Sequence, residues 1–245
     1  MINLFFIILV VLSFLLGLYR PIWKGKISES LVNHKLESLT EEYVVMNNVL
    51  LKSNGYSTQI DHLVVSPYGV FVIETKGYKG WIMGHENSEY WTQVVFRSKH
   101  KFYSPIRQNE GHIRFIRRLL KNDSIKFIPI VVFNNDATFK FICQAHTVIH
   151  RYSLISAIKS YHEVCLTQED ISKIVGTLQA NTVIADKNNM KKHVDSVQKR
   201  TYQRNYAIQN GRCPRCGGLL VMRHGRYGSF YGCANYPKCE FTKRC

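Results

Sequence analysis

The sequence predicts an α/β domain in which helices flank a mixed β-sheet. Apolar and β-branched runs bounded by turn residues predict strands between residues 43 and 97. A helical pattern follows at 106–121, and a continuous apolar run within 126–135 predicts a buried strand. This order of strands and helices is typical of a sheet whose faces are covered by helices.

The first elements after the N-terminal segment are a helix and a hairpin. Residues 31–39 carry leucine and valine on one helical face, and Ser28 is expected to cap this helix. Residues 43–53 predict a strand. Residues 58–77 form two apolar runs around a Ser-Pro-Tyr-Gly turn, which predicts a β-hairpin.

The later elements complete the domain. Residues 106–121 predict a basic amphipathic helix, with Ile113, Ile116 and Leu120 on its apolar side. The other expected elements are strands at 89–97, 126–135 and within 138–150, and helices at 154–162 and 168–180. Residues 186–205 are polar and basic, which predicts a linker, with a partly formed helix as the alternative.

The composition favours a polyanionic partner. The 245 residues include 33 Lys and Arg against 17 Asp and Glu, a formal charge of +16 at pH 7. Such a charge favours nucleic acid or an anionic lipid surface, and a merely soluble basic surface is the alternative.

The N-terminal segment predicts a membrane anchor. Residues 2–19 carry no charge, and about 18 residues at 1.5 Å each span roughly 27 Å, close to the thickness of a bilayer core. Arg20, Lys24 and Lys26 follow, so we expect a single-pass inner-membrane protein with its bulk in the cytoplasm. A cleaved signal peptide is disfavoured, because no basic residue precedes the run and no small-x-small site follows it. A buried core helix is the remaining alternative.

Three charged residues interrupt the predicted hairpin. Asp61 lies on its first strand, and Glu74 and Lys76 leave the same face of its second strand. Two neighbouring carboxylates are costly without a cation between them, and such oxygen ligands suit Mg²⁺ or Mn²⁺. A lysine beside the metal could help to deprotonate a water or neutralise transition-state charge. The pattern predicts a phosphodiester hydrolysis centre, and an exposed hairpin with a surface Glu–Lys pair is the alternative.

The hairpin also resembles a known family. The segment QIDHLVVSPYGVFVIETKGYKG is similar to the core of the nuclease-related domain family, a branch of the PD-(D/E)xK restriction-endonuclease-like superfamily. The similarity includes 25-GKISE-29, Trp91 with Gln93, and 105-PIRQN-109, with Ser28 where the family usually has glycine. The resemblance implies a restriction-endonuclease-like sheet. It places the metal ligands at Asp61 and Glu74, the catalytic lysine at Lys76 and a helical glutamate at Glu29.

Other polar residues near these motifs have less specific interpretations. Gln93 and Gln108 are expected either to contact a metal-bound water or base, or to satisfy backbone groups. His62 points to the opposite face of its strand from Asp61, and we interpret it as structural. His112 is expected to be a surface or core histidine.

Four of the seven cysteines cluster near the C-terminus. Cys213, Cys216, Cys233 and Cys239 follow the spacing C-x₂-C, sixteen residues, C-x₅-C, which predicts a tetrahedral Zn²⁺ site. About 30 residues cannot fold on an apolar core alone, so a metal is expected. Disulfides are the alternative, disfavoured by the expected cytoplasmic placement. Cys143 and Cys165 are isolated in the sequence.

The C-terminal module resembles the four-cysteine zinc finger of bacterial type I topoisomerases, through CPRCGG, GRYGSFYGC and NYPKC. Fingers of that family bind single-stranded DNA. The resemblance implies that Phe230 and Tyr231 stack on bases, unless they pack the small core instead. The residues expected to contact phosphates are Arg215, Arg223, Arg226 and Lys238.

Together these features predict five segments and one main function. The segments are a transmembrane anchor at 1–20, a nuclease-related core at 25–150, a helical extension at 151–185, a basic linker at 186–210 and a zinc finger at 211–245. The expected function is a membrane-anchored, Mg²⁺-dependent DNA nuclease. The alternatives are a non-catalytic membrane tether with a degenerate nuclease fold, and a structural membrane protein whose charge serves lipids. Two modules of nucleic-acid-binding type argue against the last.

Overall fold

The computed structural model describes residues 25–141, 143, 146–184, 186–225 and 228–244. The chain divides into two compact units, Met1–Ala185 and Asp186–Cys245. The predicted membrane anchor lies outside the described residues. Within the part of the chain that is described, no helix combines the length and the apolar character needed to cross a membrane.

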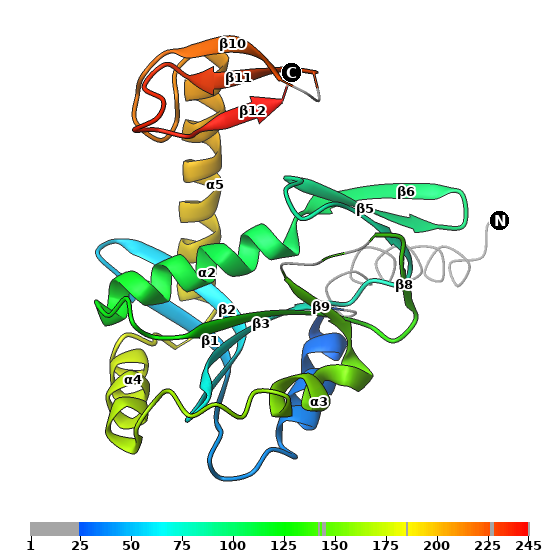
Figure 1. Cartoon of the computed structure of the whole chain (residues 1–245), viewed down its shortest axis with the longest axis vertical. Coiled ribbons are helices and arrows are strands. Elements are labelled where there is room, and N and C mark those ends of the chain that lie inside the picture. Colours follow the sequence, from blue (N-terminus) through cyan, green and yellow to red (C-terminus); the bar gives the residue numbers. More distant parts are fainter. Residues whose placement is uncertain (1–24, 142, 144–145, 185, 226–227, 245) are drawn as a thin grey trace, which may run out of the picture. The chain divides into compact units, whose positions relative to one another are not determined.

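A five-stranded mixed sheet forms the centre of the first unit (Figure 1). Its strands, in spatial order, are β1 (Val44–Ser53), β2 (Tyr56–Ser66), β3 (Gly69–Lys76), β7 (Phe127–Phe133) and β9 (Thr147–His150). The first three pair antiparallel, and β3, β7 and β9 pair parallel. The predicted α/β class with a mixed sheet is therefore confirmed.

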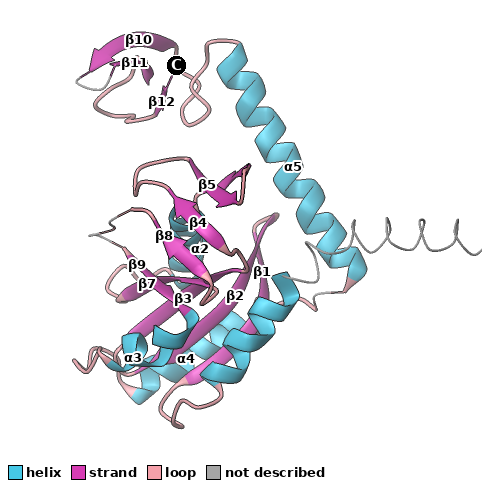
Figure 2. Ribbon diagram, turned by 90° about the vertical axis from the view of Figure 1, so that its right-hand side faces the viewer, coloured by secondary structure: helices cyan, strands magenta, loops and turns pink. Residues whose placement is uncertain are grey.

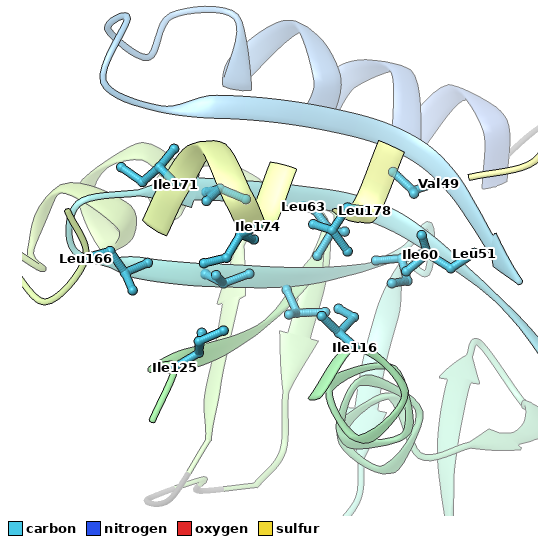
Figure 3. Close-up of a cluster of buried hydrophobic side chains, with 13 residues drawn as sticks. Val49, Leu51, Ile60, Leu63, Ile116, Ile125, Leu166, Ile171, Ile174 and Leu178 are labelled. Carbon is cyan, nitrogen blue, oxygen red and sulfur yellow. The ribbon is translucent and has the colours of Figure 1, made fainter. Parts of the chain in front are cut away.

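Helices cover both faces of this sheet. α2 (Pro105–Leu120) and α4 (Gln168–Ala180) pack with β1–β3 around one apolar cluster, which Figure 3 shows. The N-terminal helix, described over 25–36, and α3 (Leu154–Lys159) pack around a second cluster on the other face. Leu63 and Val72 belong to the first cluster, whereas Val64 and Ile73 belong to the second, as alternation along a strand requires. Each buried side chain of this size stabilises the fold by roughly 1.5–3 kcal/mol.

The turn between β2 and β3 explains why glycine occupies its last position. Gly69 has φ +131°, and a Cβ there would lie 2.8 Å from the backbone oxygen of Lys126. Ser66 Oγ accepts from the Tyr68 N–H at 3.2 Å, which stabilises the turn locally. This turn fixes the register in which the charged ends of the two strands meet.

A second, smaller sheet lies in the same unit (Figure 2). It contains β6 (Ser98–Tyr103), β5 (Tyr90–Val95), β4 (Gly80–Met83) and β8 (Ala137–Phe139), in that order. Ile82 and Trp91 from this sheet pack with Phe133 of β7 in a third apolar cluster. The two sheets therefore share a core, which holds β4–β6 beside the end of β3.

The structure corrects one predicted cap. The N-terminal helix is already formed at residue 25, so Ser28 lies within it and does not cap it. Its buried hydroxyl donates to Asn134 Oδ1 at 3.0 Å instead. Lys26 and Ile27 in the first described turn are exposed, so this turn adds no apolar side chain to the core. The apolar pattern therefore begins later than the helix and predicts its start too late.

The second unit begins with a helix where the sequence predicted a linker. α5 (Lys187–Gln209) is a polar 23-residue helix, and Asp186 caps it by accepting from the Asn189 N–H at 2.7 Å. A three-stranded sheet follows, with β10 (Leu220–Gly225), β11 (Gly228–Cys233) and β12 (Thr242–Arg244) in that order. Its small core consists of Cys213, Cys233 and Cys239, against which Leu220 and Phe241 pack.

Candidate active site and metal centres

The charged residues of the hairpin meet where β2 and β3 separate. The paired register ends at His62 opposite Ile73. Immediately beyond it, Asp61 Oδ2 accepts a hydrogen bond from the Thr75 N–H at 2.7 Å. The aspartate side chain thus replaces a backbone partner of β3, and it lies against the strand segment that carries Glu74 and Lys76.

Glu74 is the centre of a buried hydrogen-bond network. The residue is 1% exposed, Oε1 lies 2.6 Å from Lys76 Nζ, and Oε2 lies 3.2 Å from His112 Nε2. Lys76 Nζ also donates to Gln108 Oε1 at 3.0 Å, and His112 Nδ1 lies 2.7 Å from Thr58 Oγ1. The network therefore ties both strands of the hairpin to α2.

The surroundings set the charge states of these groups. Burial opposes ionisation of Glu74, but Lys76 and His112 outweigh it and lower the Glu74 pKa. Burial, followed by repulsion from Glu74, raises the pKa of Asp61 well above its ordinary value. Burial also opposes the charge on Lys76, yet Glu74 and Asp61 outweigh it and raise the Lys76 pKa. At this centre Glu74 is therefore ionised and Lys76 is an ammonium group, whereas the ionised form of Asp61 is disfavoured.

A pocket of about 840 Å³ opens beside Lys76. Glu29 lines it from the N-terminal helix, and Lys79, Gln93 and His100 line it from the segments of the smaller sheet. Burial and repulsion from Glu74 raise the pKa of Glu29, so this carboxylate interacts electrostatically with the charged residues of the hairpin. The structure therefore brings Glu29, Asp61, Glu74 and Lys76 to one site.

The donor set fits a hard divalent cation. Among the described residues, Asp61 and Glu74 are not part of any group of three or more Cys, His, Asp or Glu whose ligand atoms lie within 4.8 Å of one another. The hairpin supplies two carboxylates, and Mg²⁺ needs only one or two because that ion keeps several waters and binds substrate phosphates. A cation would also relieve the repulsion that raises the pKa of Asp61.

The structure gives three neighbouring residues roles that the sequence did not predict. Gln108 is expected to contact a metal-bound water, a base or backbone groups, but it accepts from Lys76. His112 is a core histidine, one of its two expected placements, and Thr58 is not singled out by the sequence. His112, Gln108 and Thr58 join the network around Glu74 and Lys76. The available signal is the four-residue spacing of Gln108 and His112, which puts both on one side of α2. Gln93 instead donates to the Lys79 carbonyl at 2.8 Å. His62 is buried and its Nδ1 lies 2.7 Å from Asn47 Oδ1, a structural contact as expected.

The four C-terminal cysteines form a metal centre. All four ligand atoms lie within 4.8 Å of one another, with 3.3 Å between the sulfurs of Cys216 and Cys233. The Arg215 N–H donates to Cys213 Sγ, and the Asn235 N–H donates to Cys233 Sγ, both at 3.4 Å. Such backbone donors stabilise metal-bound thiolates. The cluster fits a structural Zn²⁺ held by four sulfurs.

The side chains expected to bind DNA differ in exposure. Arg215, Lys238 and Tyr231 are exposed. Phe230 is half-buried against Gly225, and Arg223 Nη2 donates to the Cys233 carbonyl at 3.2 Å. Arg226 lies outside the described residues.

Comparison with known proteins agrees with this division. The family model of the nuclease-related domain matches residues 24–134, and that of the topoisomerase DNA-binding C4 zinc finger matches residues 210–245. The chain belongs to the nuclease-related domain family, with a C-terminal four-cysteine zinc finger of the topoisomerase type. Together the two domains support a DNA-binding, nuclease-like protein.

Relatives match either most of the chain or the finger. An uncharacterized protein of Bacillus anthracis is 38% identical over 194 residues, which cover 76% of this chain and 90% of that protein. DNA topoisomerase 1 of Methanocaldococcus jannaschii is 59% identical over 31 residues, 13% of this chain and 4% of the enzyme. The uncharacterized protein YrdD of Escherichia coli is 61% identical over 34 residues, 14% of this chain and 19% of that protein. No solved structure matches the chain.

Proposed function

We propose that this protein is a membrane-anchored, metal-dependent nuclease that hydrolyses phosphodiester bonds of DNA. The observation that carries the proposal is the buried network of Glu74, Lys76 and His112 beside Asp61, at the edge of an open pocket. Burying charged groups is costly, and apolar residues of similar size would often stabilise a fold as well or better. Strongly perturbed titratable groups beside a pocket therefore favour a catalytic role.

Asp61 and Glu74 are the proposed ligands of Mg²⁺ or Mn²⁺, and Glu29 is a supporting carboxylate from the facing helix. When bound, such an ion polarises phosphoryl oxygens and lowers the pKa of a coordinated water. The chain itself fixes the two carboxylates. The Thr75 N–H orients Asp61, and His112 orients Glu74.

Lys76 is proposed to neutralise charge and not to act as a base. Glu74 and Asp61 raise its pKa, so the side chain stays an ammonium group near neutral pH. Glu74 and Gln108 hold it at the pocket, where it can stabilise the charge that develops on a phosphoryl group. Of the two roles that the sequence leaves open, deprotonating a water and neutralising transition-state charge, we propose the second.

The substrate is proposed to be DNA. Lys79 and His100 line the pocket, and Lys99 and Lys101 are exposed on the same small sheet. The chain has a net charge of +16, and these basic side chains favour binding to the phosphate backbone of DNA. The affinity for DNA should therefore fall steeply as the salt concentration rises. The finger is proposed to capture single-stranded DNA through Tyr231, Arg215 and Lys238, whose side chains are exposed.

The anchor is proposed from the sequence of residues 2–19, which carry no charge. About 18 apolar residues partition into a bilayer far more strongly than a basic patch adsorbs to its surface. The full chain should therefore stay with inner membranes in high salt and carbonate. Release by salt alone would exclude a spanning segment.

The test of the nuclease compares three full-length proteins in detergent: wild type, Asp61→Ala and the matched control Asp123→Ala, at an exposed residue away from the site. Each is incubated with linear, circular and single-stranded DNA, with and without Mg²⁺ or Mn²⁺. Metal-dependent cleavage should be lost only in Asp61→Ala, while DNA retention persists in all three. Equal cleavage by wild type and Asp61→Ala would contradict the proposed centre. If all three proteins retain DNA and none of them cleaves it, the result would favour the non-catalytic tether.

A further inference from the structure

A second cluster of metal-ligand side chains lies outside both sites described above. Glu86 follows β4, and Cys143 and His146 lie between β8 and β9. Their ligand atoms all lie within 4.8 Å of one another. The family match ends at residue 134, so Cys143 and His146 lie beyond it. The fold thus brings together a carboxylate, a thiol and an imidazole from distant parts of the sequence.

The imidazole of His146 is oriented by a fourth residue. Its Nε2 lies 3.2 Å from Glu110 Oε1 on α2. An ionised carboxylate only accepts hydrogen bonds, so Nε2 carries a proton, and in the neutral imidazole Nδ1 then carries the lone pair. Nδ1 is buried and has no hydrogen-bond partner. A histidine whose one nitrogen donates to a carboxylate while the other stays free is typical of metal ligands.

The orphaned nitrogen points to a ligand. A buried polar atom without a partner is unfavourable, so the fold would gain from a group that accepts its lone pair. A metal ion is such a group, because the neighbouring ligand atoms belong to Glu86 and Cys143.

The sulfur of Cys143 has the surroundings of a metal ligand. The His146 backbone N–H donates to it, as the Arg215 and Asn235 N–H groups donate to sulfurs of the zinc finger. Such backbone donors stabilise metal-bound thiolates, and ligand atoms of Glu86 and His146 lie within 4.8 Å of this sulfur.

We propose that Glu86, Cys143 and His146 Nδ1 bind a second Zn²⁺, with the fourth tetrahedral position left to water. One sulfur, one nitrogen and one oxygen suit Zn²⁺, whereas Mg²⁺ and Ca²⁺ prefer oxygen ligands only. The ion would join the segment after β4 to the segment before β9, and Glu110 would link it to α2. Cys143 also packs on the apolar cluster of Ile82, Trp91 and Phe133, which would anchor the site to the core.

The test counts zinc in the full chain by native mass spectrometry after exchange against a weak chelator. Wild type should retain two Zn²⁺, and Cys143→Ala and His146→Ala should each retain one. The control is Cys165→Ala, at an exposed free cysteine, which should retain two. A single zinc in wild type, or two in Cys143→Ala, would overturn the proposal.

A milder variant guards against loss of the fold. Glu110→Gln keeps all three proposed ligands but removes the carboxylate that orients His146. Zinc titration should show the second site weakened by about 10-fold or more, with the finger site unchanged. Unchanged affinity of both sites would overturn the assigned role of His146. Titration of the metal-depleted wild type with Co²⁺ should show two ions with sulfur-to-cobalt charge-transfer absorption, because the carboxylate site of Asp61 and Glu74 offers no sulfur ligand. A single ion with that absorption would contradict a second site whatever the variants do.

Discussion

In the first unit, the carboxylates of the candidate active site lie on a hairpin whose neighbouring apolar residues are fully buried, and an internal lysine and histidine satisfy Glu74. In the second unit, three of the four cysteines are themselves the buried core. The first site thus lies on strands that apolar packing holds in place. The fold of the finger is expected to depend on the metal that its cysteines bind. Metal removal should therefore unfold the finger and leave β2, β3 and α2 folded.

The largest expected effect is on the finger. Cys216→Ser removes one of four thiolates, and structural zinc contributes roughly 10–16 kcal/mol of apparent binding free energy to such modules. Zinc at the finger should be lost, and limited proteolysis should cut within residues 211–244 while β1–β7 stay protected. Cys165→Ser is the matched control and should change neither. A protease-resistant finger without zinc would show that its fold does not depend on metal.

The next effect concerns catalysis. Lys76→Ala should slow DNA cleavage by a factor on the order of 10² or more, because it removes charge stabilisation at the pocket. Binding of DNA should persist, since it depends on the finger and on other cations. The control is Lys52→Ala, at an exposed lysine of β1. Single-turnover cleavage and filter retention measure the two properties, and near wild-type cleavage by Lys76→Ala would exclude the proposed role.

A smaller effect distinguishes two aromatic residues of the finger. Tyr231 is 37% exposed, whereas Phe230 is half-buried against Gly225. Tyr231→Ala should weaken binding of a single-stranded oligonucleotide by about 1 kcal/mol, and Phe230→Ala should mainly destabilise the finger. Fluorescence anisotropy and thermal unfolding measure these properties. Unaltered DNA binding by a folded Tyr231→Ala protein would remove Tyr231 from the interface.

The smallest effect is a gain in stability. The folded-state pKa of Asp61 is raised, so metal-free protein loses stability as pH rises from the unfolded value, near 3.8, through the folded value. Glu74 has the opposite sign, because its lowered pKa gives stability that is lost only as pH falls below about its ordinary value of 4.5. Near neutral pH, the ionised side chain of Asp61 therefore destabilises the metal-free fold, whereas that of Glu74 does not.

Asp61→Asn tests this sign directly. In chelator at pH 7, the variant should be more stable than wild type by on the order of 1 kcal/mol, and the difference should shrink toward pH 4. The asparagine oxygen can still accept the Thr75 N–H. Denaturant unfolding of the first unit measures the effect, with Asp123→Asn as the control. A variant less stable than wild type at pH 7 would show that Asp61 is not electrostatically disfavoured.

The sequence predicts the parts of the fold that follow from local periodicity. β2, β3, α2 and β7 have strong alternating, helical or continuous apolar patterns, and they lie close to their expected ranges. β4 has four residues, and β6 is polar and mostly exposed. Their pairing depends on the second sheet as a whole, so local patterns do not predict them.

The candidate site divides in the same way. A hairpin brings Asp61 beside Glu74 and Lys76, and a turn signal is enough to predict this. The partners Gln108 and His112 depend on where α2 crosses the sheet, which is a tertiary contact that no local pattern encodes. Cys143 looked isolated because Glu86 reaches it only through the fold, although the spacing Cys143-x-x-His146 is a signal available in the sequence.

The most direct measurement of the contrast between the two regions is amide hydrogen exchange of the full chain in detergent, with and without a strong chelator. The account predicts that β2, β3 and α2 keep their protection in the chelator, because buried apolar contacts and the Glu74 network hold them. Protection of β10–β12 should disappear under the same conditions. Loss of protection in both regions, or in β2, β3 and α2 alone, would contradict the account.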